Sequence, residues 1–397
     1  MTTDSDGRMR GASAEFVARA VAAGDPLPGA RDDSSSAVRG FSGELPDGRL
    51  VRDVLGRQPL FVDAAGSDGK TDWSFSPADL ADPKSLPAGH VLGFGDDGTE
   101  SEPEPKRVFS LPDPEPVRND REAVADLRGA LRGSLEAVAS ERRRERKTDD
   151  LAVAFSGGVD SAVVASLLDA PLYVVGFPES HDVEAARQAT RLMGREEDLR
   201  VVELDAELLE QAVPKVAQAT GRTNAMDVQI ALPLFLAGER AAADGFDRLA
   251  VGQGADELFG GYAKVARAPE DPRVEAETVR GAVREVVATL PDQLERDVLA
   301  LRTAEVEPVA PLLDDRVIDA ALRLPGDLLV DSRGERKKAL RLAARDFVPD
   351  RIAFREKKAV QYGSLVAREL DRLARQAGFK RRMDDHVSQY VKSRVEE

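Results

Sequence analysis

The chain has 397 residues, of which 42% are apolar, so it can bury a substantial core and is long enough for two domains. Cysteine is absent and the three histidines are far apart in sequence, which excludes disulfides and a cysteine nucleophile and argues against a structural zinc site. The net charge of −16 disfavours nonspecific nucleic-acid binding.

The acidic excess also favours solubility at high salt, and we interpret it as adaptation to a saline cytoplasm, with an ordinary acidic protein as the alternative. No apolar run approaches the roughly 20 residues that a membrane span needs. The first ten residues are polar and lack the apolar core of a secretory signal. We therefore expect a cytoplasmic protein without a membrane partner.

The first part of the chain predicts a loose segment followed by a small β-rich domain. Residues 1–40 are rich in Gly, Ser, Asp and Ala, which predicts loose order. Over 41–116, short apolar runs alternate with Gly, Pro and Asp, as in a small α+β domain. We expect strands near 51, 55, 60–62, 90–94 and 107–109, with a hairpin turn at 96–98. The proline-rich stretch 111–116 is the expected linker.

After the linker, the pattern predicts an α/β domain over 117–375 and a C-terminal tail over 376–397. Residues 120–146 have the apolar spacing of a helix. Strands and helices then alternate, which predicts a parallel sheet with helices on both faces. The expected strands are 151–155, 172–177, 200–204 and 248–251, and the expected helices are 162–168, 183–193, 207–219 and 232–243. Beyond Gly261 the pattern is mostly helical.

A glycine-rich turn, Ser156-Gly157-Gly158-Val159-Asp160-Ser161, joins the first of these strands to a helix. Ligands bind at the carboxyl ends of parallel strands, and glycines with a following helix N-terminus suit a phosphate. The turn lacks the lysine of a P-loop. Asp160 beside a polyphosphate implies Mg²⁺ between them. A tight turn with a serine cap is the alternative.

A second glycine-rich loop, 251–262, follows the strand at 248–251 and carries Asp256 and Glu257. Because both loops leave carboxyl ends of strands, we expect them to face one crevice, where Asp160 and Asp256 together hold Mg²⁺. A capped turn with solvated acids is the alternative.

These two strings resemble the synthetase domain of asparagine synthetases, in the ATP-pyrophosphatase (PP-loop) superfamily. The first string is also similar to that of NAD and GMP synthetases. Further similar segments follow in the family's order, at 174–182, 311–314, 337–341 and 355–357. Residues 52–61 and 86–90 resemble parts of a class II glutamine amidotransferase domain. The resemblance implies an adenine nucleotide alpha hydrolase-like fold behind a degenerate glutaminase-like region.

The resemblance also implies roles for individual residues. In the family, ATP adenylates the aspartate side chain, pyrophosphate leaves with Mg²⁺, and ammonia displaces AMP. Asp160 and Asp256 match metal-facing positions, and Lys337 matches a lysine that stabilises charge on the phosphates. A solvated helix lysine is the alternative for Lys337, and a surface role is open for Arg341, Arg355 and Lys357. The implied ATP contacts are Phe155, Ser156, Gly157, Gly158, Val159, Asp160, Ser161, Val175, Val251 and Gly252.

Three departures concern the acceptor and the nitrogen source. Gln253 stands where the family has a glutamate that helps to deprotonate ammonium, and an amide is no general base. Val309 replaces an arginine. Thr2 stands where the glutaminase domain has its cysteine nucleophile, so we expect no glutamine hydrolysis. A role for Thr2 as a substitute N-terminal nucleophile is the alternative.

The sequence thus predicts an ATP- and Mg²⁺-dependent asparagine synthetase that uses aspartate and ammonia. An ATP-pyrophosphatase acting on another carboxylate and a nonenzymatic ATP-binding relative are the alternatives. The tail at 357–364, similar to a divergent branch of the family, favours the former a little. The sequence leaves open whether the chain forms a homodimer or receives ammonia from another chain.

Overall fold

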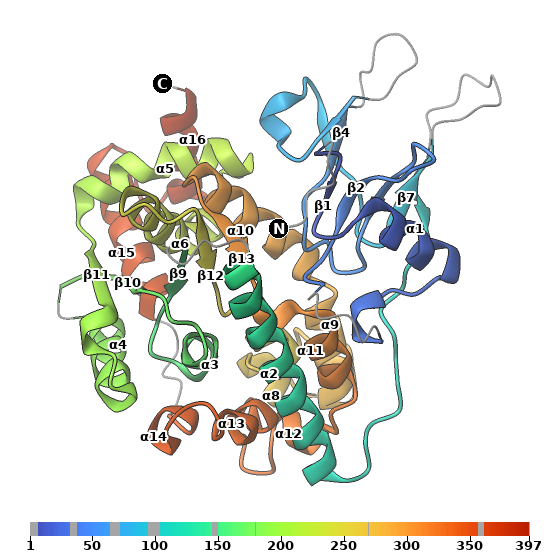
Figure 1. The fold of residues 1–397 in the computed structure, drawn as a ribbon. Coiled ribbons are helices and arrows are strands. Elements are labelled where there is room, and N and C mark those ends of the chain that lie inside the picture. The colour runs from blue at the N-terminus through green and yellow to red at the C-terminus, as the bar shows by residue number, and fades with distance from the viewer. Residues whose placement is uncertain are drawn as a thin grey trace, which may run out of the picture. The chain divides into compact units, whose positions relative to one another are not determined.

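The computed structural model describes residues 7–31, 38–63, 72–93, 104–144, 150–178, 180–268, 270–355 and 361–396 (Figure 1). The chain forms two compact units, each built from segments that are far apart in sequence. Unit 1 comprises Met1–Val138, Gln253–Glu295 and Ala310–Ala343. Unit 2 comprises Ala139–Gly252, Arg296–Val309 and Ala344–Glu397. The linear domain boundaries expected at 40, 116 and 375 stay a prediction.

Unit 2 contains the expected parallel sheet. Its strands are β9 (Leu151–Ala154), β10 (Leu172–Gly176), β11 (Leu199–Glu203), β12 (Arg248–Ala250) and β13 (Glu307–Val309). They lie in the order β11-β10-β9-β12-β13, and every neighbouring pair is parallel. The central strands β10, β9 and β12 are buried almost throughout, as expected where helices cover both faces.

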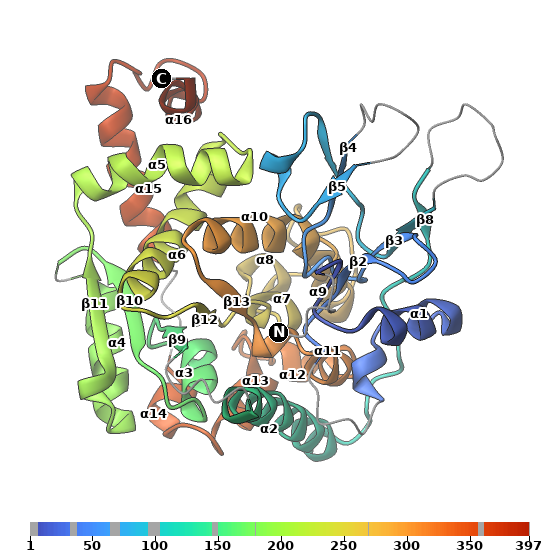
Figure 2. The same cartoon turned by 45° about the horizontal axis from the view of Figure 1, so that its top comes forward.

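The order of the strands places a topological switch point between β9 and β12. The chain runs outward from β9 through β10 to β11, and then crosses back to β12 on the other side of β9. Because crossovers are right-handed, this reversal puts the helices that follow β11 on the face opposite to the helices that precede it. Figures 1 and 2 show α3 and α4 on one face and α5 and α6 on the other. These helices are α3 (Val159–Ser166), α4 (His181–Met193), α5 (Ala206–Thr220) and α6 (Ala225–Ala243).

Most expected elements of unit 2 are present with boundaries shifted by a few residues. The largest shift is in α6, which begins at Ala225 and not near Leu232. The side chain of Asn224 caps this helix by accepting a hydrogen bond from Asp227 N at 2.9 Å. The chain of unit 2 ends in α14 (Asp350–Ala353), α15 (Gln361–Gln376) and α16 (His386–Glu396). The last of these packs against α5 and buries Tyr390 and Val391.

Unit 1 begins with the expected β-rich region. A five-stranded antiparallel sheet has the order β1-β2-β3-β7-β8, and a three-stranded sheet has the order β5-β4-β6. The strands are β1 (Met9–Arg10), β2 (Ser42–Glu44), β3 (Leu50–Arg52), β4 (Phe61–Asp63), β5 (Trp73–Ser74), β6 (Pro83–Ser85), β7 (His90–Leu92) and β8 (Lys106–Arg107). Leu50, Leu60, Leu86 and Leu92 form a core cluster in this region.

Two expectations for the N-terminal region were wrong. Residues 1–40 are not loose throughout, because β1 and the helix α1 (Ala14–Ala23) lie within them. Ser13 caps α1, Gly24 ends it in the left-handed conformation, and burial of Val17 fixes it. Leu55 lies in a turn and not in a strand, because the Asp53 side chain accepts its backbone N–H at 3.0 Å. The hairpin turn expected at 96–98 lies outside the described residues.

The rest of unit 1 is helical, as expected. The stretch 111–116 is neither helix nor strand, and Arg284 and Arg280 of α9 bind the carbonyl oxygens of Pro112 and Pro114 at 2.6 and 2.8 Å. The helices are α2 (Asp120–Arg144), whose last turns belong to unit 2, α7 (Ala255–Leu258), α8 (Ala263–Ala266), α9 (Val279–Val287), α10 (Leu290–Thr303), shared with unit 2, α11 (Asp315–Leu322), α12 (Gly326–Leu329) and α13 (Lys338–Ala344).

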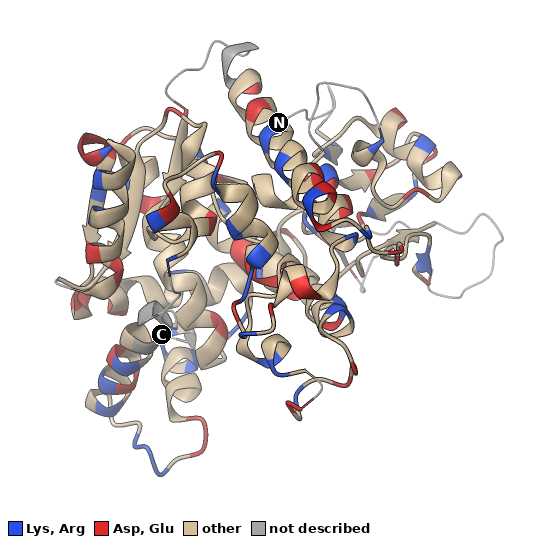
Figure 3. Ribbon diagram, turned by 90° about the horizontal axis from the view of Figure 1, so that it is seen from below, with Lys and Arg blue, Asp and Glu red and all other residues tan. Residues whose placement is uncertain are grey.

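Acidic residues are interspersed with basic ones along the helices and do not gather in one segment (Figure 3).

In the described part of the chain, no helix combines the length and the apolar character needed to cross a bilayer.

Candidate active site

The glycine-rich turn lies at the carboxyl end of β9 and is organised by its own serines. Ser156 N donates to Ser161 Oγ at 3.1 Å, and the two hydroxyl oxygens are 3.2 Å apart. Gly158 is the N-cap of α3, so Val159, Asp160 and Ser161 form its first turn. The backbone N–H groups of a first turn have no acceptor within their own helix. The turn therefore offers hydroxyl and N–H donors together with a positive helix end, as a phosphate site requires.

Gly157 cannot be any other residue, because the turn packs directly on α4. Its φ is 71°, in the left-handed region, and a Cβ on it would lie 2.5 Å from the carbonyl oxygen of Ala185. Arg355 binds the same carbonyl oxygen through Nη1 at 3.0 Å and reaches Gln188 Oε1 at 2.9 Å. The structure therefore places Arg355 behind the turn, as a residue that holds α4, whereas Lys357 lies outside the described residues.

The carboxyl end of β12 lies directly beside this turn. A Cβ on Gly252 would be 3.3 Å from Asp160 Cβ and from Ser161 N, so the chain leaving β12 passes close to the start of α3. Val251 N donates to Val309 O at 2.9 Å, which extends the pairing of β12 with β13. The positions expected to hold the nucleoside, Phe155, Val175 and Val251, are all buried at this edge of the sheet.

The second loop belongs to unit 1 from Gln253 onward, and it brings Asp256 to Lys337. Lys337 Nζ lies 2.8 Å from Asp256 Oδ1, and the lysine is only 2% exposed. A Cβ on Gly261 would lie 1.9 Å from Asp256 Oδ1 and 2.4 Å from Lys337 Cε. Only glycine therefore allows this ion pair, and the solvated-lysine alternative for Lys337 is excluded by its burial.

The backbone of Lys337 is held in an unusual conformation. Its φ is 60°, which costs a residue other than glycine about 1–2 kcal/mol. Its N–H donates to Leu329 O at 2.8 Å, and its carbonyl oxygen accepts from Arg341 N at 2.9 Å. Arg336 Nη1 donates to Gly261 O at 2.5 Å, which ties the lysine's segment to the second loop. Such strain persists where surrounding contacts impose it, and functional sites are a common place for it.

Glu257 is a member of this site that sequence reasoning did not select. It is 7% exposed, and Tyr262 Oη donates to its Oε1 at 2.5 Å. Burial raises the pKa of Glu257, against the opposing effect of the Tyr262 hydrogen bond. The signal for it was the apolar and glycine-rich string around the Asp-Glu pair, which indicates a packed loop and not a solvated one.

Comparison with known proteins shows what this arrangement belongs to. The family model described as asparagine synthase matches residues 131–280 and 267–394, which include both loops and the Lys337 segment. The chain belongs to the asparagine synthase family. This family's named relatives are carbon–nitrogen ligases.

Three relatives give the extent of the similarity. A protein of Methanocaldococcus jannaschii named as a glutamine-hydrolyzing asparagine synthetase 1 is 30% identical over 87% of this chain and 72% of its own length. Asparagine synthetase B of Escherichia coli is 26% identical over 53% of this chain and 41% of its own length. Asparagine synthetase 1 of Saccharomyces cerevisiae is 23% identical over 79% of this chain and 61% of its own length. The chain spans less than two thirds of the latter two.

Two departures from the family's pattern, Gln253 and Val309, lie within the described residues. Gln253 is half-buried at the start of the unit 1 part of the second loop. Val309, in place of an arginine, is buried in β13 beside Ala250. Thr2 lies outside the described residues.

The expected metal ligands, Asp160 and Asp256, belong to different units, so their joint binding of Mg²⁺ stays a prediction. Within the described ranges, no three or more His, Asp or Glu side chains gather as a metal cage.

Proposed function

We propose that the chain is an ATP- and Mg²⁺-dependent asparagine synthetase. ATP adenylates the side-chain carboxylate of aspartate and releases pyrophosphate, and ammonia then displaces AMP to give asparagine. Two features of this member of the asparagine synthase family support the proposal. One is the donor-rich turn at the switch point of the sheet, and the other is the buried ion pair of Lys337 with Asp256.

The residues of the turn are proposed to hold the β- and γ-phosphates of ATP. Ser156 and Ser161 supply hydroxyl donors, and the first turn of α3 supplies backbone N–H groups and the positive end of its dipole. Gly157 and Gly252 let the backbone come close to the ligand without a side chain in between. Phe155, Val175 and Val251 are proposed to contact the nucleoside.

Lys337 is proposed to stabilise the negative charge that moves onto pyrophosphate as the α–β bond of ATP breaks. A buried ammonium is worth more there than in water, because little solvent screens it. Asp256 orients the lysine by its ion pair. Mg²⁺, when bound by Asp160 and Asp256, would neutralise phosphate charge.

The nitrogen source is proposed to be free ammonia. The chain has no cysteine, so it lacks the cysteine nucleophile of class II glutamine hydrolysis. Incubation with glutamine in place of ammonium should yield no glutamate. Release of glutamate by the pure protein would overturn this part of the proposal.

A second candidate, activation of a different carboxylate, is favoured by Gln253 and Val309. Neither residue carries charge, so the acceptor side offers no general base and no carboxylate-binding guanidinium at these two positions. Both changes leave the ATP-binding residues untouched, so adenylation chemistry is expected in either case.

One assay separates the candidates. The protein is incubated with ATP, Mg²⁺, ammonium and aspartate at high salt, and AMP, pyrophosphate and asparagine are measured. Asparagine formation supports the first candidate. Pyrophosphate release that requires a different acid supports the second, and the absence of AMP under all conditions overturns both. Asp160→Ala serves as the control and should abolish pyrophosphate release.

A further inference from the structure

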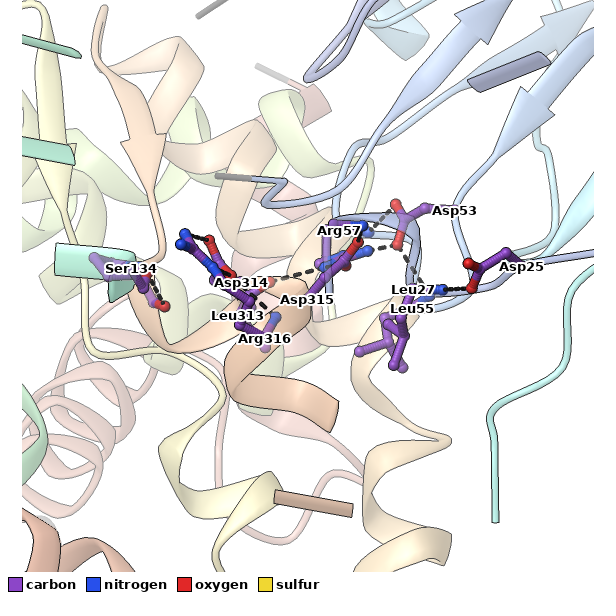
Figure 4. Close-up of polar contacts among 12 residues, drawn as sticks. Asp25, Leu27, Asp53, Leu55, Arg57, Ser134, Leu313, Asp314, Asp315 and Arg316 are labelled. Carbon is purple, nitrogen blue, oxygen red and sulfur yellow. Dashed lines mark hydrogen bonds and ion pairs between the residues drawn. The ribbon is translucent and has the colours of Figure 1, made fainter. Parts of the chain in front are cut away.

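A buried arginine of the N-terminal β-rich region reaches the segment that supports the second loop. Arg57 is 4% exposed, and its partners Asp53 and Asp315 are fully buried. Arg57 Nε donates to Asp53 Oδ1 at 2.8 Å, and Nη1 donates to Asp315 Oδ1 at 2.7 Å. Figure 4 shows Arg57 lying between the two carboxylates, which come from segments far apart in the sequence. Burial alone would lower the pKa of Arg57, but the two carboxylates outweigh that effect and raise it.

The same contact fixes the backbone around Leu313. Arg57 Nη1 also donates to Leu313 O at 2.8 Å, and Asp315 Oδ2 accepts from Gly29 N at 2.9 Å. Asp315 N in turn donates to Val38 O at 3.0 Å. The N-terminal region therefore holds residues 313–315 by side-chain and backbone hydrogen bonds together.

The held segment is what the second loop rests on. Gly254 has a φ of 87°, and a Cβ on it would lie 2.4 Å from Leu313 Cδ2, so the loop backbone packs directly on the leucine. Gly254 is the N-cap of α7, the helix that carries Asp256 toward Lys337. From the other side, Ser134 Oγ donates to Pro311 O at 2.7 Å, so the support is fixed at both ends.

We infer that Arg57 and Asp315 are positioning residues for the second loop, so that the N-terminal region, without a cysteine nucleophile, serves as the brace of the ATP-cleaving site. A buried charge pair is often no more stabilising than apolar residues of the same volume, so its presence needs a geometric reason. Arg57 supplies one, because a fork of donors fixes a carbonyl oxygen and two carboxylates at once. The catalytic part of this inference rests on the proposed function.

The test removes the brace without leaving buried charge. Arg57→Met alone would strand two carboxylates, so the main variant combines Asp53→Asn, Arg57→Met and Asp315→Asn. The matched control combines Glu141→Gln, Asp150→Asn and Arg248→Met, which removes another buried arginine together with the charges of its two carboxylates, Asp150 at 3.3 Å and Glu141 at 3.5 Å, at the amino end of β12. Fluorescence of Trp73, the one tryptophan of the chain, verifies that the N-terminal region is folded in each variant.

The first readout is amide hydrogen exchange over residues 254–261, where Leu258 N and Gly261 N donate to Gly254 O and Asp256 O. We expect exchange there to become about tenfold faster in the triple variant, as loss of one charged hydrogen bond implies, and to stay unchanged in the control. Unchanged exchange in a folded triple variant would overturn the inference. No substrate is used, so this outcome does not depend on the proposed function.

The second readout is pyrophosphate release by the wild type and both variants. A positioning role predicts a lower kcat for the triple variant with little change in the KM for ATP, because the phosphate-binding turn belongs to unit 2. A purely structural role would lower the folded fraction and leave kcat per folded molecule unchanged. Lack of pyrophosphate release by the wild type would contradict the proposed function and leave the exchange result standing.

Discussion

Replacing Gly261 by alanine tests the ion pair at the centre of the site. The added Cβ would lie 1.9 Å from Asp256 Oδ1, and ordinary contact begins at about 3.4 Å, so the carboxylate must retreat by about 1.5 Å. The Lys337–Asp256 separation would grow from 2.8 Å to about 4.3 Å. At an effective dielectric constant of about 20, Coulomb's law gives a loss of about 2 kcal/mol, or roughly thirtyfold.

The assay is the initial rate of pyrophosphate release from ATP, with Mg²⁺, aspartate and ammonium, for folded protein. We expect kcat to fall roughly thirtyfold in Gly261→Ala, with a loss of about 1–3 kcal/mol in the free energy of unfolding from overpacking. The control is Gly129→Ala in α2, where φ is ordinary and nothing lies within 4 Å of the added Cβ. It should keep full activity and gain up to about 1 kcal/mol of stability. A folded Gly261→Ala protein with kcat within twofold of wild type would refute the reasoning.

Four further outcomes are expected. Lys337→Met should lower kcat by about 10²–10³-fold, and an unchanged kcat would remove its electrostatic role. Gly157→Ala, whose Cβ meets Ala185 O at 2.5 Å, should raise the KM for ATP sharply, and normal ATP binding would contradict the phosphate assignment. Burial raises the pKa of Glu257, so its stabilising contribution is present below the ordinary carboxyl pKa and is lost as pH rises through the raised value. The free energy of unfolding of Glu257→Gln, measured by chemical denaturation, should therefore increase relative to that of wild type as pH rises above about 4. Thermal unfolding should shift upward with added KCl if the charge of −16 reflects salt adaptation, and full stability in dilute buffer would remove that idea.

The brace at Arg57 gives the N-terminal region a role that needs no cysteine. The contact joins residues 258 positions apart, so neither partner's role is visible in its local sequence. If the brace functions as we infer, the structural role of that region does not depend on glutamine hydrolysis.

The sequence by itself determined the local chemistry of the site. The glycine-rich turn after β9, the acidic second loop and the alternation of strands and helices were all predicted, because a strand, a tight turn and a helix N-terminus are specified by adjacent residues. It was wrong where tertiary contacts override a polar composition. The helix α1 lies in a segment that reads as loose, and it is fixed by a capping serine and by burial of Val17.

Only the tertiary structure decided which residues meet. Contacts between segments far apart in sequence create the ion pair of Lys337 with Asp256 and bury Glu257. They also require the glycine at position 261, which leaves room for the ion pair. The same holds for Arg57 and Asp315. A periodic pattern fixes which face of an element is apolar. The pairing of buried charges is fixed by the packing of whole elements, because a buried carboxylate needs a partner and the fold decides which cation lies within reach of it.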